Sequence, residues 1–311
     1  MIPSMPGKSY RGVLPPLTSQ EIKLQMALEQ DINVLAQEIG ERNYLNPKNL
    51  RASADFLEKK FLSCGYQVQR QAYEVNSQTF ENLVVEIRGS THPDEIIVIG
   101  GHYDSVVGCP GANDNGSGAA AVLELARIFA RKKPERTLRF VEFVNEEPPF
   151  AMTEGMGSLV YARYCKQCQD NIVGMLSLET MGYYSDELGS QRFPFPLGNF
   201  YPSTGNYIAF VTHLKSTSLI RQVISSFRRH TKFPSEGAAV PEQIPGISYS
   251  DHWSFWQAGY PAIMVTDTAM FRYPYYHAWN DTPEQINYDR LARVVAGLAR
   301  VIAELVTSSP N

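Results

Sequence analysis

The sequence is poor in the features that mark several classes of protein. Its 311 residues include four cysteines, Cys64, Cys109, Cys165 and Cys168, which are too few for a disulfide-rich scaffold. The Cys165-x-x-Cys168 pair has no second such pair to complete a structural zinc site, so we interpret both cysteines as structural, with an adventitious disulfide as the alternative. No apolar run approaches the roughly 18 residues that span a bilayer, and no membrane span is expected.

Charge of one sign is not in excess either. There are 28 Lys and Arg residues against 32 Asp and Glu residues, a net charge of −4, which gives no electrostatic reason to bind nucleic acid. The first residues carry charges but no apolar segment of a secretory signal. We therefore expect either a cytoplasmic protein or a trimmed secreted or periplasmic form. The sequence indicates neither the compartment nor the oligomeric state.

Hydrophobic periodicity predicts the fold class. The N-terminal segment 1–65 is predicted to be helical, with helices over 18–39 and 48–63. After it, apolar strands alternate with amphipathic helices. This order predicts a single α/β domain over 1–311, in which a mostly parallel central sheet has helices on both faces. Strands are expected at 66–75, 80–89, 95–101, 137–145, 172–179, 207–214 and 261–267, and the later helices at 115–132, 156–167, 216–229 and 285–306.

One long segment, 186–206, is rich in Pro, Gly and Phe and has no periodic pattern. Segments of this length are often functional, so we expect either a lid over a site or a plain surface loop.

Acidic residues and one histidine stand where the apolar strands end. His102 and Asp104 follow one strand, the pair Glu146-Glu147 follows the next, and Glu179 ends a third. Ligands bind at the carboxyl ends of strands in open α/β sheets, so these side chains are expected to converge. Asp114, in the loop GCPGANDNGSG, brings the carboxylates to five. Burying five carboxylates together is costly without a cation, which predicts a metal centre.

A second histidine, His277, lies in the segment YPYYHAWNDTPE. A set of histidines and carboxylates without thiolates suits zinc or a related divalent metal. His92, His213 and His230 are interpreted as ordinary structural residues. For His252 we leave open a place beside the site and a place at the start of a helix.

The ordered combination of these motifs resembles the M28 family of co-catalytic zinc aminopeptidases, of the bacterial leucyl-aminopeptidase type. The motifs run from residue 102 to residue 284, and the resemblance covers roughly residues 78–306. They are HYD at 102–104, GANDNGSG at 111–118, NEE at 145–147, SLETMGYYSD at 177–186 and YYHAWNDTPE at 275–284.

The resemblance implies two zinc ions per chain. One would be held by His102 and Glu179, the other by Glu147 and His277, and Asp114 would bridge both. Each ion then has three protein ligands and an open position, as catalytic zinc requires. In paired sites of this kind the metals activate a shared water molecule.

The resemblance also implies the catalytic groups. Glu146 matches the general base, and Asp104 matches the acid that orients the imidazole of His102. Tyr276 resembles a tyrosine that stabilises the developing oxyanion, although Tyr273 or Tyr275 could take that place. The expected substrate is a peptide with a free N-terminus, whose α-amine the acidic groups would bind.

Two departures from the family pattern affect these expectations. Here PPFAMT follows Glu147, which leaves Glu154 as a rival ligand. The fourth ligand is Glu179, where many relatives carry the shorter Asp. The aromatic residues Phe193, Phe195, Phe200, Phe271 and Tyr273 are expected either to wall an apolar pocket for the N-terminal side chain or to pack beneath a loop.

Other functions remain as alternatives. A glutaminyl cyclase with one zinc ion has related motifs, and a non-catalytic module can share the fold. A nucleotide-binding loop is excluded because the glycine-rich segment 111–118 lacks the lysine of a P-loop. A serine hydrolase is disfavoured because no GxSxG motif follows a strand.

Overall fold

The computed structural model describes residues 3–307. Helix α1 (Ser19–Asn33) begins at a capping box, in which the side chains of Thr18 and Glu21 each accept from the other's backbone N–H. A π-helical turn over Val34–Ile39 continues it. Helix α2 (Pro47–Ser63) starts with a proline, which costs no hydrogen bond at that position. Helical structure therefore covers most of residues 19–63.

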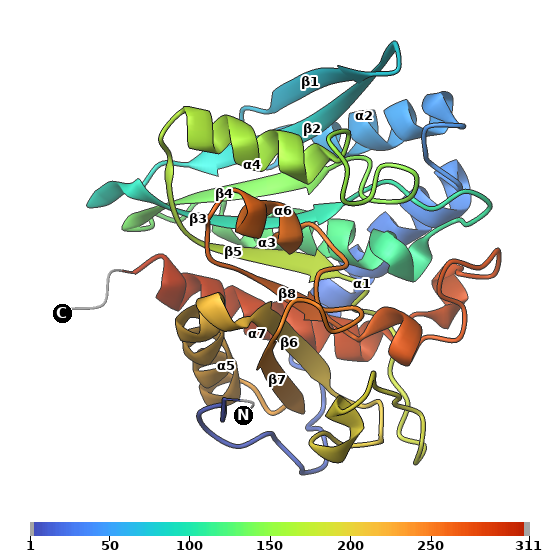
Figure 1. The fold of residues 1–311 in the computed structure, drawn as a ribbon, viewed down its shortest axis with the longest axis vertical. Helices are drawn as coiled ribbons and strands as arrows, with labels where there is room; N and C mark the ends of the chain where they lie inside the picture. The colour runs from blue at the N-terminus through green and yellow to red at the C-terminus, as the bar shows by residue number, and fades with distance from the viewer. Residues whose placement is uncertain (1–2, 308–311) are drawn as a thin grey trace.

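One eight-stranded sheet runs through the molecule (Figure 1). Its order is β1-β2-β4-β3-β5-β8-β6-β7, and four of the seven neighbouring pairs are parallel. The pairs β1·β2, β2·β4 and β6·β8 are antiparallel. The strands are β1 (Gln69–Val75), β2 (Gln78–Ile87), β3 (His92–His102), β4 (Arg136–Phe143), β5 (Asn171–Glu179), β6 (Ile208–His213), β7 (Ser235–Val240) and β8 (Ala262–Thr266).

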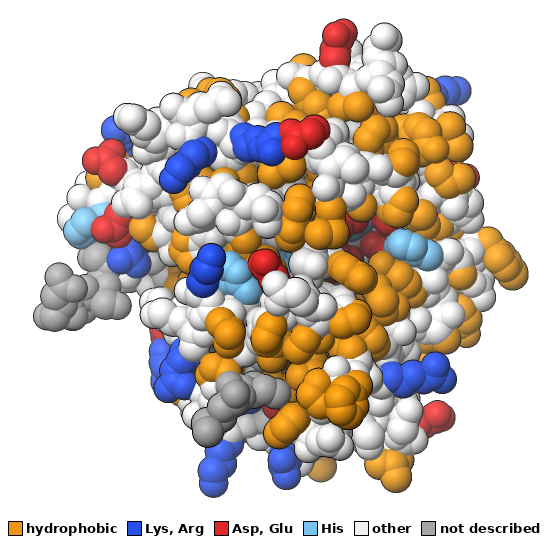
Figure 2. Space-filling view, viewed as in Figure 1, with side chains coloured by type: hydrophobic (Ala, Val, Ile, Leu, Met, Phe, Trp, Pro, Cys, Tyr) orange, Lys and Arg blue, Asp and Glu red, His pale blue; other side chains and the backbone are white. Residues whose placement is uncertain are grey.

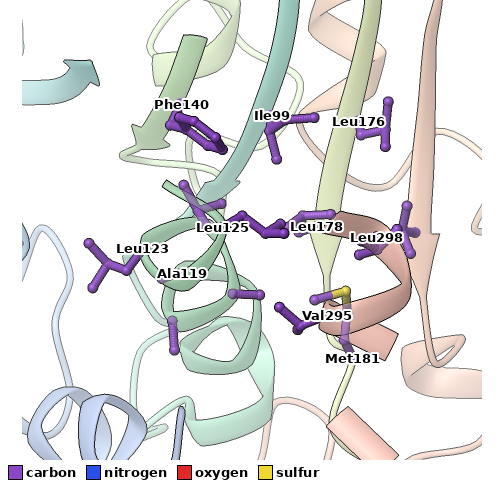
Figure 3. Packing of buried hydrophobic residues seen from close by; sticks show 14 of the residues in the cluster. Ile99, Ala119, Leu123, Leu125, Phe140, Leu176, Leu178, Met181, Val295 and Leu298 are labelled. Carbon is purple, nitrogen blue, oxygen red and sulfur yellow. The ribbon is translucent and has the colours of Figure 1, made fainter. Parts of the chain in front are cut away.

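Helices cover both faces of this sheet, because alternate strand residues point to opposite sides. In β3, Ile97 and Ile99 belong to one buried cluster with α1, α2, α3, α5 and α7, and Figure 3 shows part of this cluster. Ile96 and Val98 belong to a second cluster with α4 and α6. The predicted fold class is confirmed. The later helices are α3 (Gly118–Phe129), α4 (Gly157–Gln167), α5 (Thr217–His230), α6 (His252–Gln257) and α7 (Tyr288–Leu305).

Two elements were not predicted. Strand β7 has the sequence SEGAAV, which contains one β-branched residue and no aromatic residue, so it lacks the usual strand signal. It forms because it pairs with β6 at the edge of the sheet. Helix α6 is only six residues long, too short for a periodic pattern to show; it was foreseen only as the alternative in which His252 starts a helix, and His252 is its first residue.

No helix within residues 3–307 combines the length and the apolar character that a membrane crossing needs.

Candidate metal centre

The sheet order brings the predicted metal ligands together. Strands β4, β3 and β5 are neighbours and run parallel, so their carboxyl ends share one edge. His102 is the last residue of β3 and lies opposite Phe143 of β4. Since Gly100 pairs with Ser177, Glu179 at the end of β5 lies beside His102. Glu146 follows β4 by three residues.

Asp114 lies between the two histidines. Its Oδ1 is 3.4 Å from Nε2 of His102, and its Oδ2 is 3.2 Å from Nε2 of His277. Each histidine also faces a glutamate: Nε2 of His102 is 3.2 Å from Oε2 of Glu179, and Nε2 of His277 is 3.2 Å from Oε2 of Glu147. The five side chains thus form two half-sites that share one carboxylate.

Glu146 lies next to the first half-site. Its Oε2 is 3.6 Å from Nε2 of His102, and ligand atoms of His102, Glu146 and Glu179 all lie within 4.8 Å of one another. The same holds for His102, Asp114 and Glu147. The side chain of Glu146 is 13% exposed, against 7% for Glu179 and 3% for Glu147. Glu146 is therefore the glutamate most open to the cleft.

The polar atoms of this cluster fit a metal site. Nε2 of His102 and Oε1 of Glu147 are buried, and neither has a hydrogen-bond partner among residues 3–307. Buried polar atoms in proteins are nearly always satisfied, so such atoms indicate a missing partner. Burial, followed by the charge of Asp114, raises the pKa of Glu147 to about 8. A divalent cation would supply the positive charge that this donor set lacks.

A second layer of acids holds the ligands in place. Nδ1 of His102 lies 3.2 Å from the backbone carbonyl oxygen of Asp104 and 3.4 Å from its Oδ1. The carboxylate of Asp104 also accepts the backbone N–H groups of Glu146 and Glu147, each at 3.2 Å. It is therefore placed both to orient the imidazole and to fix the loop that bears two glutamates.

Asp281 holds the loop of Asp114 in the same way. It accepts the backbone N–H of Asn113 at 2.8 Å and that of Asp114 at 3.0 Å, and the hydroxyl of Tyr273 donates to it at 2.6 Å. Gly111 begins this loop with a φ of +64°, and a Cβ there would lie 2.4 Å from the carbonyl oxygen of Asp114. Only glycine fits that position without strain.

The three candidate tyrosines differ in their surroundings. Tyr273 is buried and bonded to Asp281, so its hydroxyl is already engaged. The ring of Tyr275 packs edge-on against that of Tyr273. Tyr276 stacks on the ring of His277, with centroids 3.9 Å apart, and lines a pocket together with Glu179. Among the three, Tyr276 is therefore best placed to face a substrate.

An apolar pocket opens beside Glu179 and Tyr276. Part of its wall is the segment predicted as lid or surface loop: Phe193, Leu197 and Tyr201 line it. In Figure 2, carboxylates and a histidine lie in a hollow, and hydrophobic side chains gather around its mouth. Segment 186–206 is therefore part of the cleft wall. Further lining residues from the sheet and nearby loops are Val211, Ala238, Ile247, Met264, Met270 and Phe271.

Some residues considered from the sequence lie elsewhere. Glu154 has a side chain that is 78% exposed and pairs with Arg163, which removes it as a ligand candidate. His252 is buried, with its Nε2 2.7 Å from the carbonyl oxygen of Ile247. Phe195 and Phe200 are 90% and 64% exposed and do not line the pocket.

Several buried residues near the centre were missed by the sequence reasoning. The hydroxyl of Ser250 donates to Oε2 of Glu179 at 2.7 Å, and Asp251 beside it is fully buried. Burial raises the pKa of Asp251 to about 7. Asp281 belongs to the motif YYHAWNDTPE, four residues after His277. Its place in that motif was the sequence signal that could have identified it as part of the site. Arg42 precedes the first motif by 60 residues in the sequence, so no motif pointed to it.

The comparisons with known proteins agree with this geometry. The sequence pattern of "Peptidase family M28" matches residues 82–302, more than half of the chain. The chain is 35% identical over 284 residues to the uncharacterized protein YfbL of Escherichia coli, covering 88% of this chain and 86% of that one. It is 31% identical over 207 residues to a probable zinc metalloprotease of Leptosphaeria maculans, covering 60% of this chain and 46% of the fungal protein.

Solved structures share the fold at low identity. A zinc aminopeptidase from Bacillus subtilis superposes with a TM-score of 0.73 at 15% identity, covering 92% of this chain and 95% of that one. A glutaminyl cyclase from Fimbriiglobus ruber superposes with a TM-score of 0.67 at 20% identity, covering 94% and 97%. These likenesses concern the fold, whereas the sequence match concerns the family. The prediction of a hydrolytic enzyme is thus confirmed, and the chain belongs to peptidase family M28.

Proposed function

We propose that the chain is a zinc aminopeptidase that hydrolyses the first peptide bond of peptides with a free N-terminus. The observation that carries this proposal is the position of Asp114, whose two oxygens face different histidines at 3.4 and 3.2 Å. A single metal would need only one of these oxygens. The carboxylate is thus suited to bridge two ions, and the name of the fungal relative supports zinc as the metal.

Five residues would hold the two ions. His102 and Glu179 would bind one, Glu147 and His277 would bind the other, and Asp114 would bind both. When bound, zinc ions in such a centre lower the pKa of a water ligand and polarise the scissile carbonyl group. The donor set is oxygen and nitrogen only, a combination of ligands found at catalytic zinc sites.

Glu146 would act as the general base. It sits beside the centre, and its carboxylate is the most exposed of the three glutamates. In that position it can take the proton of the attacking water and pass it to the amine of the leaving peptide as the C–N bond breaks. Asp104 fixes the backbone of Glu146, so the base needs no reorganisation during the reaction.

Tyr276, Glu146 and Glu179 would bind and orient the substrate. The phenol of Tyr276 would donate a hydrogen bond to the carbonyl oxygen as negative charge develops there. Glu146 and Glu179 would bind the protonated α-amine. The apolar pocket that begins at Glu179 and Tyr276 would take the N-terminal side chain, which favours large apolar residues such as leucine, methionine and phenylalanine.

The test combines metal analysis with a substrate panel. The purified chain is loaded with zinc, its metal content is measured, and it is assayed on aminoacyl anilides, on N-terminally acetylated controls and on an N-terminal glutamine peptide. We expect two zinc ions per chain, release of apolar N-terminal residues and no cleavage of acetylated substrates. One zinc ion with glutamine cyclisation would replace the proposal by a cyclase, and no turnover on any substrate would indicate a non-catalytic module.

A further inference from the structure

Arg42 is a fully buried cation beneath the metal centre. Its side chain has no exposed surface, although arginine is rarely buried in proteins. All of its side-chain hydrogen bonds go to backbone carbonyl oxygens. Nε donates to Tyr103 at 2.6 Å, Nη2 donates to Gly111 at 2.8 Å, and Nη1 contacts the carbonyl oxygens of Pro110, Leu35 and Gly40.

These carbonyl groups belong to the segments that present two ligands. Tyr103 follows His102 directly, while Pro110 and Gly111 lead into Asp114. The backbone of Arg42 also joins the same loop, because its N–H donates to Oγ of Ser105 at 3.1 Å and its carbonyl accepts from the N–H of Ser105 at 2.9 Å. One side chain thus ties the end of β3 to the loop of Asp114.

The charge of Arg42 has no direct counter-ion within residues 3–307. Its hydrogen bonds all go to carbonyl groups, yet Asp104, Asp114 and Asp281 lie near enough to act on it. Burial lowers the pKa of Arg42, and these three acids oppose that effect. A buried charge without a partner is costly, so the cation is retained only if the surrounding acids offset its burial.

The residue also lies outside the part of the chain that matches the family. The match begins at residue 82, whereas Arg42 stands between the π-helical turn Val34–Ile39 and α2. The N-terminal segment is therefore more than a covering for the sheet, because it carries a contact that reaches the site.

We infer that Arg42 is a positioning residue for the metal centre. Its planar guanidinium group holds the carbonyl groups of Tyr103, Pro110 and Gly111 in one arrangement, and so fixes how His102 and Asp114 face each other. Its positive charge offsets the carboxylates of that centre. The inference rests on the ligand set of the proposed function. It predicts that metal affinity depends on a side chain that is not a ligand.

The experiment compares Arg42→Lys with Arg42→Met and with the control Arg228→Lys. Lysine keeps the charge but cannot donate to three carbonyl groups in a plane, whereas methionine removes both. Arg228 is a suitable control because its guanidinium also donates to backbone carbonyl groups, those of Pro6, Gly7 and Ser235. It does so at the outermost strand β7, four strands from β3 in the sheet order, and away from the segments that bear His102 and Asp114.

The main measurement is zinc affinity, obtained by titrating the apo-protein. We expect Arg42→Lys to weaken it by about 10 to 100-fold, as residues behind metal ligands commonly do, and Arg42→Met to weaken it further. With saturating zinc, kcat should fall for Arg42→Lys while KM stays within about twofold, since the substrate pocket is untouched. Arg228→Lys should leave both quantities unchanged.

Two outcomes would overturn the inference. One is a wild-type zinc affinity in Arg42→Lys. The other is a loss of zinc binding that is fully explained by a smaller fraction of folded protein. If Arg42→Met does not fold, Ser105→Ala provides the second test, because it weakens the same connection without removing the charge. Zinc affinity can be measured even if the wild type cleaves no peptide, so failure of the aminopeptidase proposal is separable from failure of this one.

Discussion

Acidic side chains have different partners at the two ends of the parallel strands. At the amino ends, three acids have an arginine as direct partner: Arg136 pairs with Glu95, and Arg139 pairs with Glu86 and Asp170. At the carboxyl ends the acids of the centre face one another and two histidines, and Arg42 beneath them donates its hydrogen bonds to carbonyl groups. The first arrangement is neutralised by the protein itself, whereas the second lacks a positive charge that a metal ion would supply. Density of acidic residues alone therefore does not indicate function; missing partners do.

The largest expected difference between the two ends is in catalysis. Glu146→Gln should lower kcat by about 10² to 10⁴-fold, because a general base contributes that much, while metal content stays at the wild-type level. The matched control is Glu95→Gln at the other end, which should turn over substrate normally. Near-normal turnover in Glu146→Gln would remove the base assignment.

The second prediction concerns metal retention. His277→Ala should bind less zinc than the wild type, because it removes one of three protein ligands from the half-site of Asp114 and Glu147. The check is elemental analysis after dialysis against a weak chelator. His230→Ala, an exposed histidine paired with Glu304, should keep the full metal content. Equal zinc in both variants would exclude His277 from the ligand set.

The third prediction concerns stability at low pH and a histidine away from the centre. Burial lowers the pKa of His252 to about 4, from about 6.5 in an unfolded chain. Between these values the unfolded chain takes up a proton and the folded chain does not, so stability falls as pH decreases. The loss is complete near pH 4 and amounts to about 3 kcal/mol.

The check is the free energy of unfolding of the wild type and of His252→Gln, measured by denaturant titration from pH 7.5 to pH 4. Subtracting the two curves removes the contribution of the acids. Parallel curves would mean that His252 titrates normally in the folded protein.

The smallest effect is expected at the amino ends of the parallel strands, where the acids are paired with arginines. Arg139→Gln should lower the free energy of unfolding by about 1 to 2 kcal/mol, because the arginine is largely buried but its partner Glu86 is 40% exposed. Zinc content and kcat should not change. A large loss of activity at unchanged stability would show that the two ends of the sheet are coupled.

The sequence indicated the candidate site residues because the ends of apolar strands can be recognised in it. Near-continuous apolar runs identified β3, β4 and β5, and the residue after each run had to lie at the carboxyl edge if the strands were parallel neighbours. The same reasoning could not find β7, whose small residues carry no strand signal. It also could not find Ser250 or Asp251, which meet Glu179 and its surroundings only through folding.

What the sequence determined by itself is the chemistry available: the kinds of ligand, their order along the chain, and the fold class that would gather them. The tertiary structure alone decided the distances between His102, Asp114 and His277, which Tyr among three faces the pocket, and that Arg42 lies beneath the centre. The physical reason is that strand and helix patterns are local, with a period of a few residues. Burial of a charge, by contrast, depends on segments that are distant in the chain and meet only when the core forms.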